Sequence, residues 1–193
     1  GNHSDVRKAV SSDFKKKGDS IYLLGETHQE LGASELAFML RDEGQGGIGG
    51  SVPAIDPSRN LAMYRALTGA MAKSLVSSAH DCSDGGLAVA LAECCFGADS
   101  GASIDLGPVM KDSESLDKWG ALFGESLGRI LVSVKQERRE EFEMVMEGHS
   151  CHHIGSVTEG DDIIFSNTGE EILVTSMSEV RTAWKQALDG GGV

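Results

Sequence analysis

The stretch Ser78-Ala79-His80-Asp81-Cys82-Ser83-Asp84-Gly85-Gly86-Leu87 is the most informative part of this chain. It brings a histidine, two carboxylates, a thiol, hydroxyl groups and two glycines into one turn, and an alanine-rich apolar run follows it. Helical periodicity on both sides predicts that this turn joins two helices, with Gly85 and Gly86 opening the second. The free N–H groups and partial positive charge of such a helix start favour a phosphate.

The same turn also has a purely structural interpretation. Ser83 and Asp84 are common N-cap residues, and the glycines allow a tight turn. Asp81 and Asp84 would repel an anion unless a cation such as Mg²⁺ lay between them. Cys82 next to His80 suggests a nucleophile, but the sequence supplies no third group to orient the pair, so a small buried thiol is expected. A ligand site and a helix cap both remain open.

Length and composition favour one soluble globular domain. The chain has 193 residues, of which 40% are hydrophobic and 24% charged, close to globular averages. No apolar run reaches the roughly 20 residues of a membrane helix, and the start is too polar for a signal peptide. A net charge of −13 argues against nucleic-acid binding, which needs Lys and Arg facing phosphates. The adjacent Cys94 and Cys95 favour reduced thiols in the cytoplasm.

Hydrophobic periodicity predicts an α+β fold, a mixed sheet flanked by helices. A strand is expected at 20–24, a short helix at 35–40 with Ser34 as N-cap, and a long helix from Asp56 and Pro57 to Val76. Beyond the turn, we predict strands at 102–106, 129–134, 154–157, 162–165 and 171–175, and helices at 87–96, 116–123, 136–146 and 178–188, the last capped at Ser178.

The chain is expected to hold a single domain at 20–189, preceded by a lead-in segment at 1–19 and followed by a flexible tail at 190–193. The glycine-rich stretch 44–51 is expected to be a mobile connector. No initiator Met is present, so residues 1–4 are either a cloning remnant or part of a longer protein. We therefore expect a piece of a larger chain.

Two further clusters carry polar chemistry. In the segment Gly124-Glu125-Ser126-Leu127-Gly128-Arg129, Glu125 can bind a cation or a sugar hydroxyl, and the Arg129 guanidinium can donate two hydrogen bonds to a phosphate. The simpler alternative is that Glu125 and Arg129 form a surface ion pair. His149-Ser150-Cys151-His152-His153 suggests a metal site. Its spacing is too tight for a closed zinc site, so a loop rich in histidine by chance is favoured.

Taken together, these residues resemble the last domain of the formylglycinamidine ribonucleotide synthetases (phosphoribosylformylglycinamidine synthases), within the aminoimidazole ribonucleotide synthetase superfamily. The matching segments occur in order along most of the chain: Ser12 to Lys15, Ile21 to Thr27, Glu30 to Glu35, His80 to Leu87, Glu125 to Arg129 and Ile154 to Val157. The string His-Asp-x-Ser-Asp-Gly-Gly-Leu is specific for this enzyme within its superfamily. Gly32-Ala33-Ser34 departs mildly from the usual Gly-Gly-Ser.

The resemblance implies a fold like the C-terminal domain of aminoimidazole ribonucleotide synthetase and a parent ligase of purine biosynthesis. That ligase converts formylglycinamide ribonucleotide, ATP and glutamine-derived ammonia into the amidine. ATP and Mg²⁺ would serve the full enzyme, with none bound tightly to this fragment. Implied partners are the N-terminal barrel-forming domains of the same enzyme, a glutaminase subunit or domain and, in the short form, a small accessory subunit. Neither nucleic acid nor membrane is implied.

The family's catalytic groups lie in the barrel-forming domains, so the resemblance implies no catalytic residue in this chain and leaves any metal ligand unassigned. This domain corresponds to the pseudo-symmetric copy, which in some members lines an auxiliary nucleotide site. The residues expected to face a ligand or to serve structure are His80, Asp81, Ser83, Asp84, Gly85, Gly86, Glu125, Ser126 and Arg129. Two alternatives stay open: another superfamily member of the selenophosphate or thiamine-phosphate kinase type, or a freestanding nucleotide- or metal-binding module.

Overall fold

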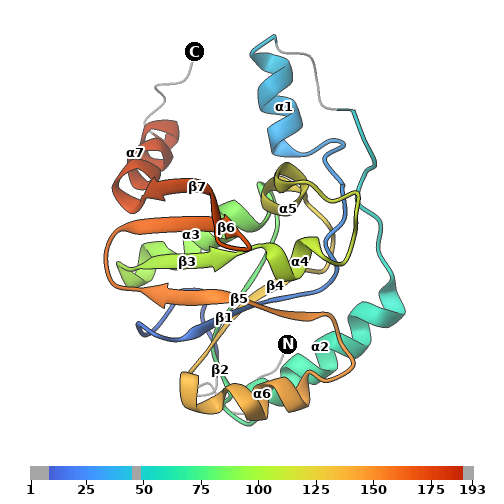
Figure 1. Ribbon diagram of the computed structural model, residues 1–193, viewed down its shortest axis with the longest axis vertical. Helices are drawn as coiled ribbons and strands as arrows, with labels where there is room; N and C mark the ends of the chain where they lie inside the picture. Colours follow the sequence, from blue (N-terminus) through green and yellow to red (C-terminus); the bar gives the residue numbers. More distant parts are fainter. Residues whose placement is uncertain (1–8, 45–48, 189–193) are drawn as a thin grey trace.

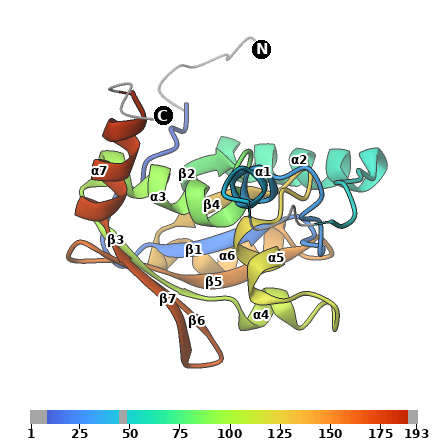
Figure 2. The ribbon, with the colours of Figure 1, turned by 90° about the horizontal axis from the view of Figure 1, so that it is seen from above.

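The computed structural model describes residues 9–44 and 49–188. In these residues the strands form one mixed seven-stranded sheet in the order β2-β4-β1-β5-β3-β6-β7 (Figure 1). The strands are β1 (Ser20–Leu24), β2 (Val76–Asp81), β3 (Gly101–Asp105), β4 (Ile130–Val134), β5 (Cys151–Thr158), β6 (Asp162–Asn167) and β7 (Glu170–Ser176). Neighbouring strands pair antiparallel except β3 and β6, which are parallel. Figure 2 shows the strong twist that turns β6 and β7 away from β1.

Helices cover the sheet and connect its strands. They are α1 (Glu35–Asp42), α2 (Pro57–Ala72), α3 (Gly86–Ala98), α4 (Gly107–Met110), α5 (Lys118–Phe123), α6 (Arg139–Val145) and α7 (Met177–Leu188), with a 3₁₀ turn at Gln136–Arg138 before α6. This arrangement confirms the predicted α+β fold with a mixed sheet flanked by helices.

Strand β1 lies between two hydrophobic cores. Ile21 and Leu23 join the core formed with α3, α5 and β6, whereas Tyr22 and Leu24 join the core formed with α2 and α6. All five residues of the strand are buried. Because side chains alternate along a strand, a continuous apolar run fits a strand that is covered on both faces.

Several local predictions are confirmed. Strand β1 has the predicted bounds, and Ser34 caps α1 by accepting a hydrogen bond from the Ala37 amide. Asp56 caps α2 by accepting from the amides of Ser58 and Arg59, with Pro57 in the first turn. These caps follow from short side chains that satisfy the free N–H groups of a helix start.

The main error concerns the segment before the turn. The predicted helix to Val76 ends at Ala72 instead, and Val76–Asp81 is strand β2, paired with β4 at the edge of the sheet. The turn therefore joins a strand to a helix rather than two helices. Leu75 and Val76 continued the apolar spacing of α2, so periodicity alone did not reveal the break.

Smaller differences lie elsewhere. Helix α4 was not predicted, and α7 begins one residue before the expected cap Ser178. At its start Ser176 and Glu179 exchange hydrogen bonds, each accepting from the other's amide, as in a capping box.

Phe14 of the lead-in segment is buried and its amide donates to the Cys94 carbonyl. The expectations for residues 1–4 and 190–193, and for 45–48 of the connector, fall outside the described residues. In the described part of the chain, none of the helices has the length and hydropathy needed to cross a membrane.

Gly155 permits the close approach of β5 and β3. A Cβ atom there would overlap the Ser103 carbonyl oxygen on the neighbouring strand. We predict that Gly155→Ala lowers the free energy of unfolding by about 2 kcal/mol, as overpacking does. Gly69→Ala, in α2 where a Cβ meets nothing within 4 Å, is the matched control and should stabilise by about 0.5–1 kcal/mol. Urea unfolding measures both, and equal effects would contradict this account of Gly155.

Candidate functional site at one end of the sheet

The predicted site segments meet at one end of the sheet. Strands β1 and β2 end at Leu24 and Asp81, and both residues pair with Ile130, the first residue of β4. Leu24 also pairs with Cys151, the first residue of β5. The loops that follow β1 and β2 therefore lie beside those that precede β4 and β5.

The His80–Gly86 turn has its own internal contacts. His80 Nε2 lies 2.7 Å from Glu93 Oε2 on α3, which joins the end of β2 to the helix that follows. The Ser83 hydroxyl donates to Asp81 Oδ2, and this hydrogen bond holds the pKa of Asp81 below its ordinary value. The side chains of Ser83 and Asp84 are exposed. Asp81, Ser83 and Asp84 therefore present the turn's polar groups to solvent.

Cys82 is unsuited to act as a nucleophile here. It is buried, and burial raises the pKa of its thiol to about 11. Its amide donates to the Arg129 carbonyl at 3.1 Å. A thiol that stays protonated near neutral pH is not an activated nucleophile, as the sequence indicated.

The two glycines of the turn are required by its shape. Gly85 and Gly86 have φ of 77° and 67°, the left-handed region that glycine tolerates. A Cβ on Gly86 would lie 2.5 Å from the Gly124 carbonyl oxygen. Gly85 is the residue before α3, and no side chain caps this helix. The alternative in which Ser83 or Asp84 is its N-cap is therefore wrong.

The Glu125 carboxylate holds the place expected for an anion. Its Oε1 accepts hydrogen bonds from the Gly85 amide and from the Glu35 amide, each at 2.9 Å. Glu125 therefore contacts the start of α3 and the start of α1 together. The chain's own carboxylate already satisfies these two N–H groups.

Arg129 is buried, and the predicted surface ion pair with Glu125 is wrong. Only 1% of Arg129 is exposed. Its guanidinium donates to the carbonyls of Gly124 and Ser126 and to the Thr27 hydroxyl. Burial lowers the pKa of Arg129, while the nearby carboxylates of Glu30 and Glu125 act in the opposite direction. Ser126 is also buried, and its hydroxyl accepts from the His28 amide at 3.0 Å. Both residues fix the loop from inside.

Three neighbouring cavities lie at this end of the sheet, and because carboxylates line them we call them together the polar trough. A cavity of about 400 Å³ is lined by Asp81, Ser83, Asp84 and Glu125. It shares Leu127 with a second cavity of about 370 Å³. The second shares several residues with a third of about 310 Å³, beside His149 and Ser150.

Sequence reasoning missed most of the middle of this trough, where Glu26, His28, Glu30, Arg59 and Asn60 line the second cavity. Glu26 and Glu30 stood in the matching segments but were not chosen as site residues. Glu30 is 6% exposed, and among the described residues neither its Oε2 nor Asn60 Nδ2 has a hydrogen-bond partner. Arg59 and Asn60 lie in the first turn of α2, where no motif marks them.

The His149–His153 cluster does not gather around one point. His152 Nε2 lies 2.9 Å from Asp112, whereas the next residue, His153, packs against the Tyr22 ring with centroids 5.1 Å apart. Successive residues of β5 point to opposite faces. Within residues 9–44 and 49–188, no group of three or more His, Cys, Asp or Glu side chains has the geometry of a metal site.

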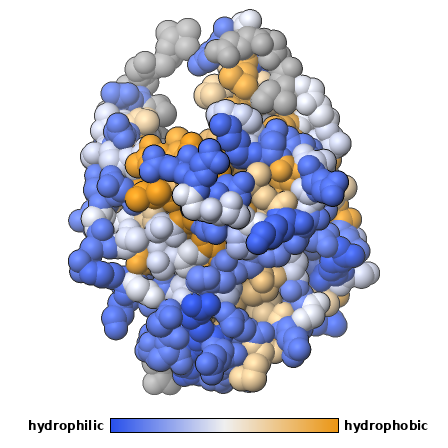
Figure 3. Space-filling view, viewed as in Figure 1, coloured by the Kyte–Doolittle hydropathy of each residue, from blue (hydrophilic) through white to orange (hydrophobic). Residues whose placement is uncertain are grey.

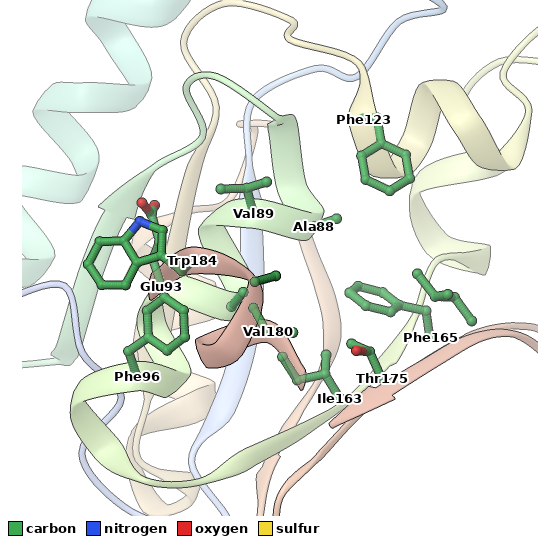
Figure 4. Close-up of a pocket in the computed structure, with 13 residues that line it drawn as sticks. Ala88, Val89, Glu93, Phe96, Phe123, Ile163, Phe165, Thr175, Val180 and Trp184 are labelled. Atoms are coloured by element: carbon green, nitrogen blue, oxygen red, sulfur yellow. The ribbon is translucent and has the colours of Figure 1, made fainter. Parts of the chain in front are cut away.

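A further cavity of about 420 Å³ is apolar and lies between α3 and α7 (Figure 4). Phe96 and Trp184 stack on one side with centroids 5.1 Å apart, and Phe123 and Phe165 lie on the other. Glu93 and Thr175 are its polar lining residues. It lacks the convergent polar groups that the trough offers.

Residues 16–166 match the protein family described as AIR synthase related protein, C-terminal domain. The chain belongs to this family.

Solved structures share the fold. The chain is 18% identical to T. maritima PurL complexed with FGAR, with a TM-score of 0.78 over 91% of this chain and 30% of that one. It is 18% identical to T. maritima PurL complexed with ATP, with a TM-score of 0.72 over 90% of this chain and 27% of that one. It is 17% identical to hydrogenase maturation protein HypE in complex with ATP, with a TM-score of 0.60 over 89% of this chain and 54% of that one. The chain thus spans less than a third of the PurL chains and about half of HypE.

The buried guanidinium yields a testable prediction. Arg129→Met leaves the carbonyls of Gly124 and Ser126 without their donor, so we expect a loss of about 3 kcal/mol in the free energy of unfolding. Arg129→Lys keeps the charge but loses the planar guanidinium donors, so its free energy of unfolding should lie between those of Arg129→Met and the wild type. Arg65→Met, at an exposed position of α2, should change stability by less than about 0.5 kcal/mol. Chemical denaturation measures all three, and an Arg129→Met variant as stable as the control would refute the role.

Proposed function

We propose that this chain is the C-terminal domain of a formylglycinamidine ribonucleotide synthetase. One observation carries the proposal. Four segments of the resemblance, 21–27, 30–35, 80–87 and 125–129, come from three separate parts of the chain and contribute residues to one polar trough. Membership of the AIR synthase related family and the fold shared with PurL support it.

In the parent enzyme, the amide oxygen of formylglycinamide ribonucleotide is phosphorylated by ATP, and ammonia then displaces phosphate. The described residues do not form a metal site by themselves, and the chain's own Glu125 satisfies the Gly85 amide. They therefore do not fit Mg²⁺ or a nucleotide phosphate without other domains. We assign no chemical step to this chain, which would be inactive alone.

The proposed role of the domain is to form one wall of a larger site. Asp81, Ser83 and Asp84 are the candidates to face a ligand, because they are exposed and line the trough. Gly85, Gly86, Glu125, Ser126 and Arg129 have the structural part of the role, since their groups hold the turn. His80 belongs with them through its contact with Glu93.

The same proposal includes partners and location. The rest of the site would come from N-terminal barrel-forming domains, and ammonia from a glutaminase in the cytoplasm. This chain shares its fold, over 90% of its own length, with a structure of PurLQS from Thermotoga maritima. We infer that the parent of this chain belongs to an assembly comparable to PurLQS.

Another superfamily member is the main alternative, because HypE shares the fold. The His-Asp-x-Ser-Asp-Gly-Gly-Leu string favours the synthetase. The alternative of a freestanding metal-binding module is not supported, because His152 and His153 contact different partners and do not converge on one point.

The parent protein provides the decisive test. Expressed from the full reading frame, it should release ADP only when formylglycinamide ribonucleotide and ammonium are both present, and should form the amidine, detected by mass spectrometry. Substrates of the selenophosphate and thiamine-phosphate types serve as the comparison. ATP turnover with one of those, and none with formylglycinamide ribonucleotide, would assign the chain to the alternative.

A second prediction concerns this chain alone. Because its site is incomplete, we expect millimolar or undetectable affinity for Mg²⁺-ATP in isothermal titration calorimetry. We expect no ATP hydrolysis. Tight binding that is abolished by Asp81→Ala with Asp84→Ala, or turnover by the isolated chain, would contradict the proposed incompetence.

A further inference from the structure

Two helices begin close to the same carboxylate oxygen. Glu125 Oε1 accepts from the amide of Glu35, the first residue of α1, and from the amide of Gly85, the residue before α3. The starts of both helices carry partial positive charge and would repel each other without an anion between them. The Glu125 carboxylate supplies that anion from within the chain.

Glu125 is itself held on a rigid support. Its neighbours Gly124 and Ser126 both offer their carbonyls to the buried Arg129 guanidinium. The Glu125 amide lies 3.4 Å from the Glu30 carbonyl. The position of the carboxylate is therefore fixed by backbone contacts on both sides, so the carboxylate can hold the starts of α1 and α3 in a fixed relative position.

Among the described residues, α1 buries little of its side-chain surface. Ala37 is its buried residue, while Phe38 and Met39 are 41% and 51% exposed. Figure 1 shows α1 projecting from the body beyond α5, and Figure 3 shows apolar surface on it within a mostly hydrophilic face. Beyond the Ser34 cap, the Glu125 bond to Glu35 is the contact that ties the first turn of α1 to the turn before α3.

We propose that Glu125 is a positioning residue that couples the His80–Gly86 turn to α1 through one carboxylate oxygen. Because the Gly85 and Glu35 amides share one fixed carboxylate oxygen, loss of that carboxylate releases the start of α3 and the start of α1 together. This coupling is a property of the domain and holds for any parent enzyme.

Hydrogen–deuterium exchange tests the coupling in this chain. Glu125→Ala should accelerate exchange at the start of α1 and at the start of α3 together, by about tenfold, because each loses a charge-assisted hydrogen bond. Exchange in α6 should be unchanged. Glu147→Gln, at an exposed position, is the control and should alter neither helix start. Faster exchange at only one of the two, or a uniform increase that includes α6, would overturn the proposal.

Chemical rescue separates an anion's role from mere packing. In Glu125→Ala, acetate should restore slow exchange at both helix starts, whereas acetamide, its neutral isostere, should not at the same concentration. If Glu125→Ala fails to fold, exchange is measured in Glu125→Gln without rescue: the amide oxygen still accepts but carries no charge, so both helix starts should exchange faster than in the wild type. Absence of rescue by acetate, equal rescue by acetamide, or a Glu125→Gln variant that exchanges like the wild type would refute the anionic role.

Discussion

The buried guanidinium of Arg129 is the interaction on which this end of the molecule depends. A positive charge that is 1% exposed is costly unless it is hydrogen-bonded and balanced. Here two backbone carbonyls and the Thr27 hydroxyl receive its hydrogen bonds, and the charges of Glu30 and Glu125 favour its protonated form. The loop before β4 and the loop after β1 are thereby joined at one point. The position of Glu125, and through it the starts of α1 and α3, follows from that joint.

The charge of the trough bears on what the domain can hold. Glu26, Glu30, Asp81, Asp84 and Glu125 line it, and the whole chain carries −13. Arg129 lines the first cavity from its buried position, and Arg59 lines the other two with its guanidinium against Glu26. Phosphate groups would be repelled unless a cation or the basic groups of another domain faced them. The acidic trough thus agrees with a wall of a shared site better than with a nucleotide site complete in itself.

The sequence predicted features whose cause is local. Strand β1 and the Ser34 and Asp56 caps follow from short-range rules, and the glycine pair follows from the need for positive φ. Strand β2 was missed because its formation depends on pairing with β4, whose paired residues lie 49 to 58 positions further along the chain. The burial of Arg129 could not be predicted from the sequence either. Whether an arginine lies on the surface or inside depends on acceptors from separate loops, and no spacing in the sequence records them.

Helix α3 links the two kinds of surface on this domain. At its start it faces the polar trough through Gly85 and Glu125. About two turns further on, Glu93 accepts a hydrogen bond from His80 while also lining the apolar cavity beside Trp184. The second wall of that cavity comes from β7 and α7, which lie beyond the family match at 16–166. A shift of α3 would therefore alter both surfaces together, because the small side chains of its buried face, Ala90 and Ala92 among them, pack it closely and leave little room for independent adjustment.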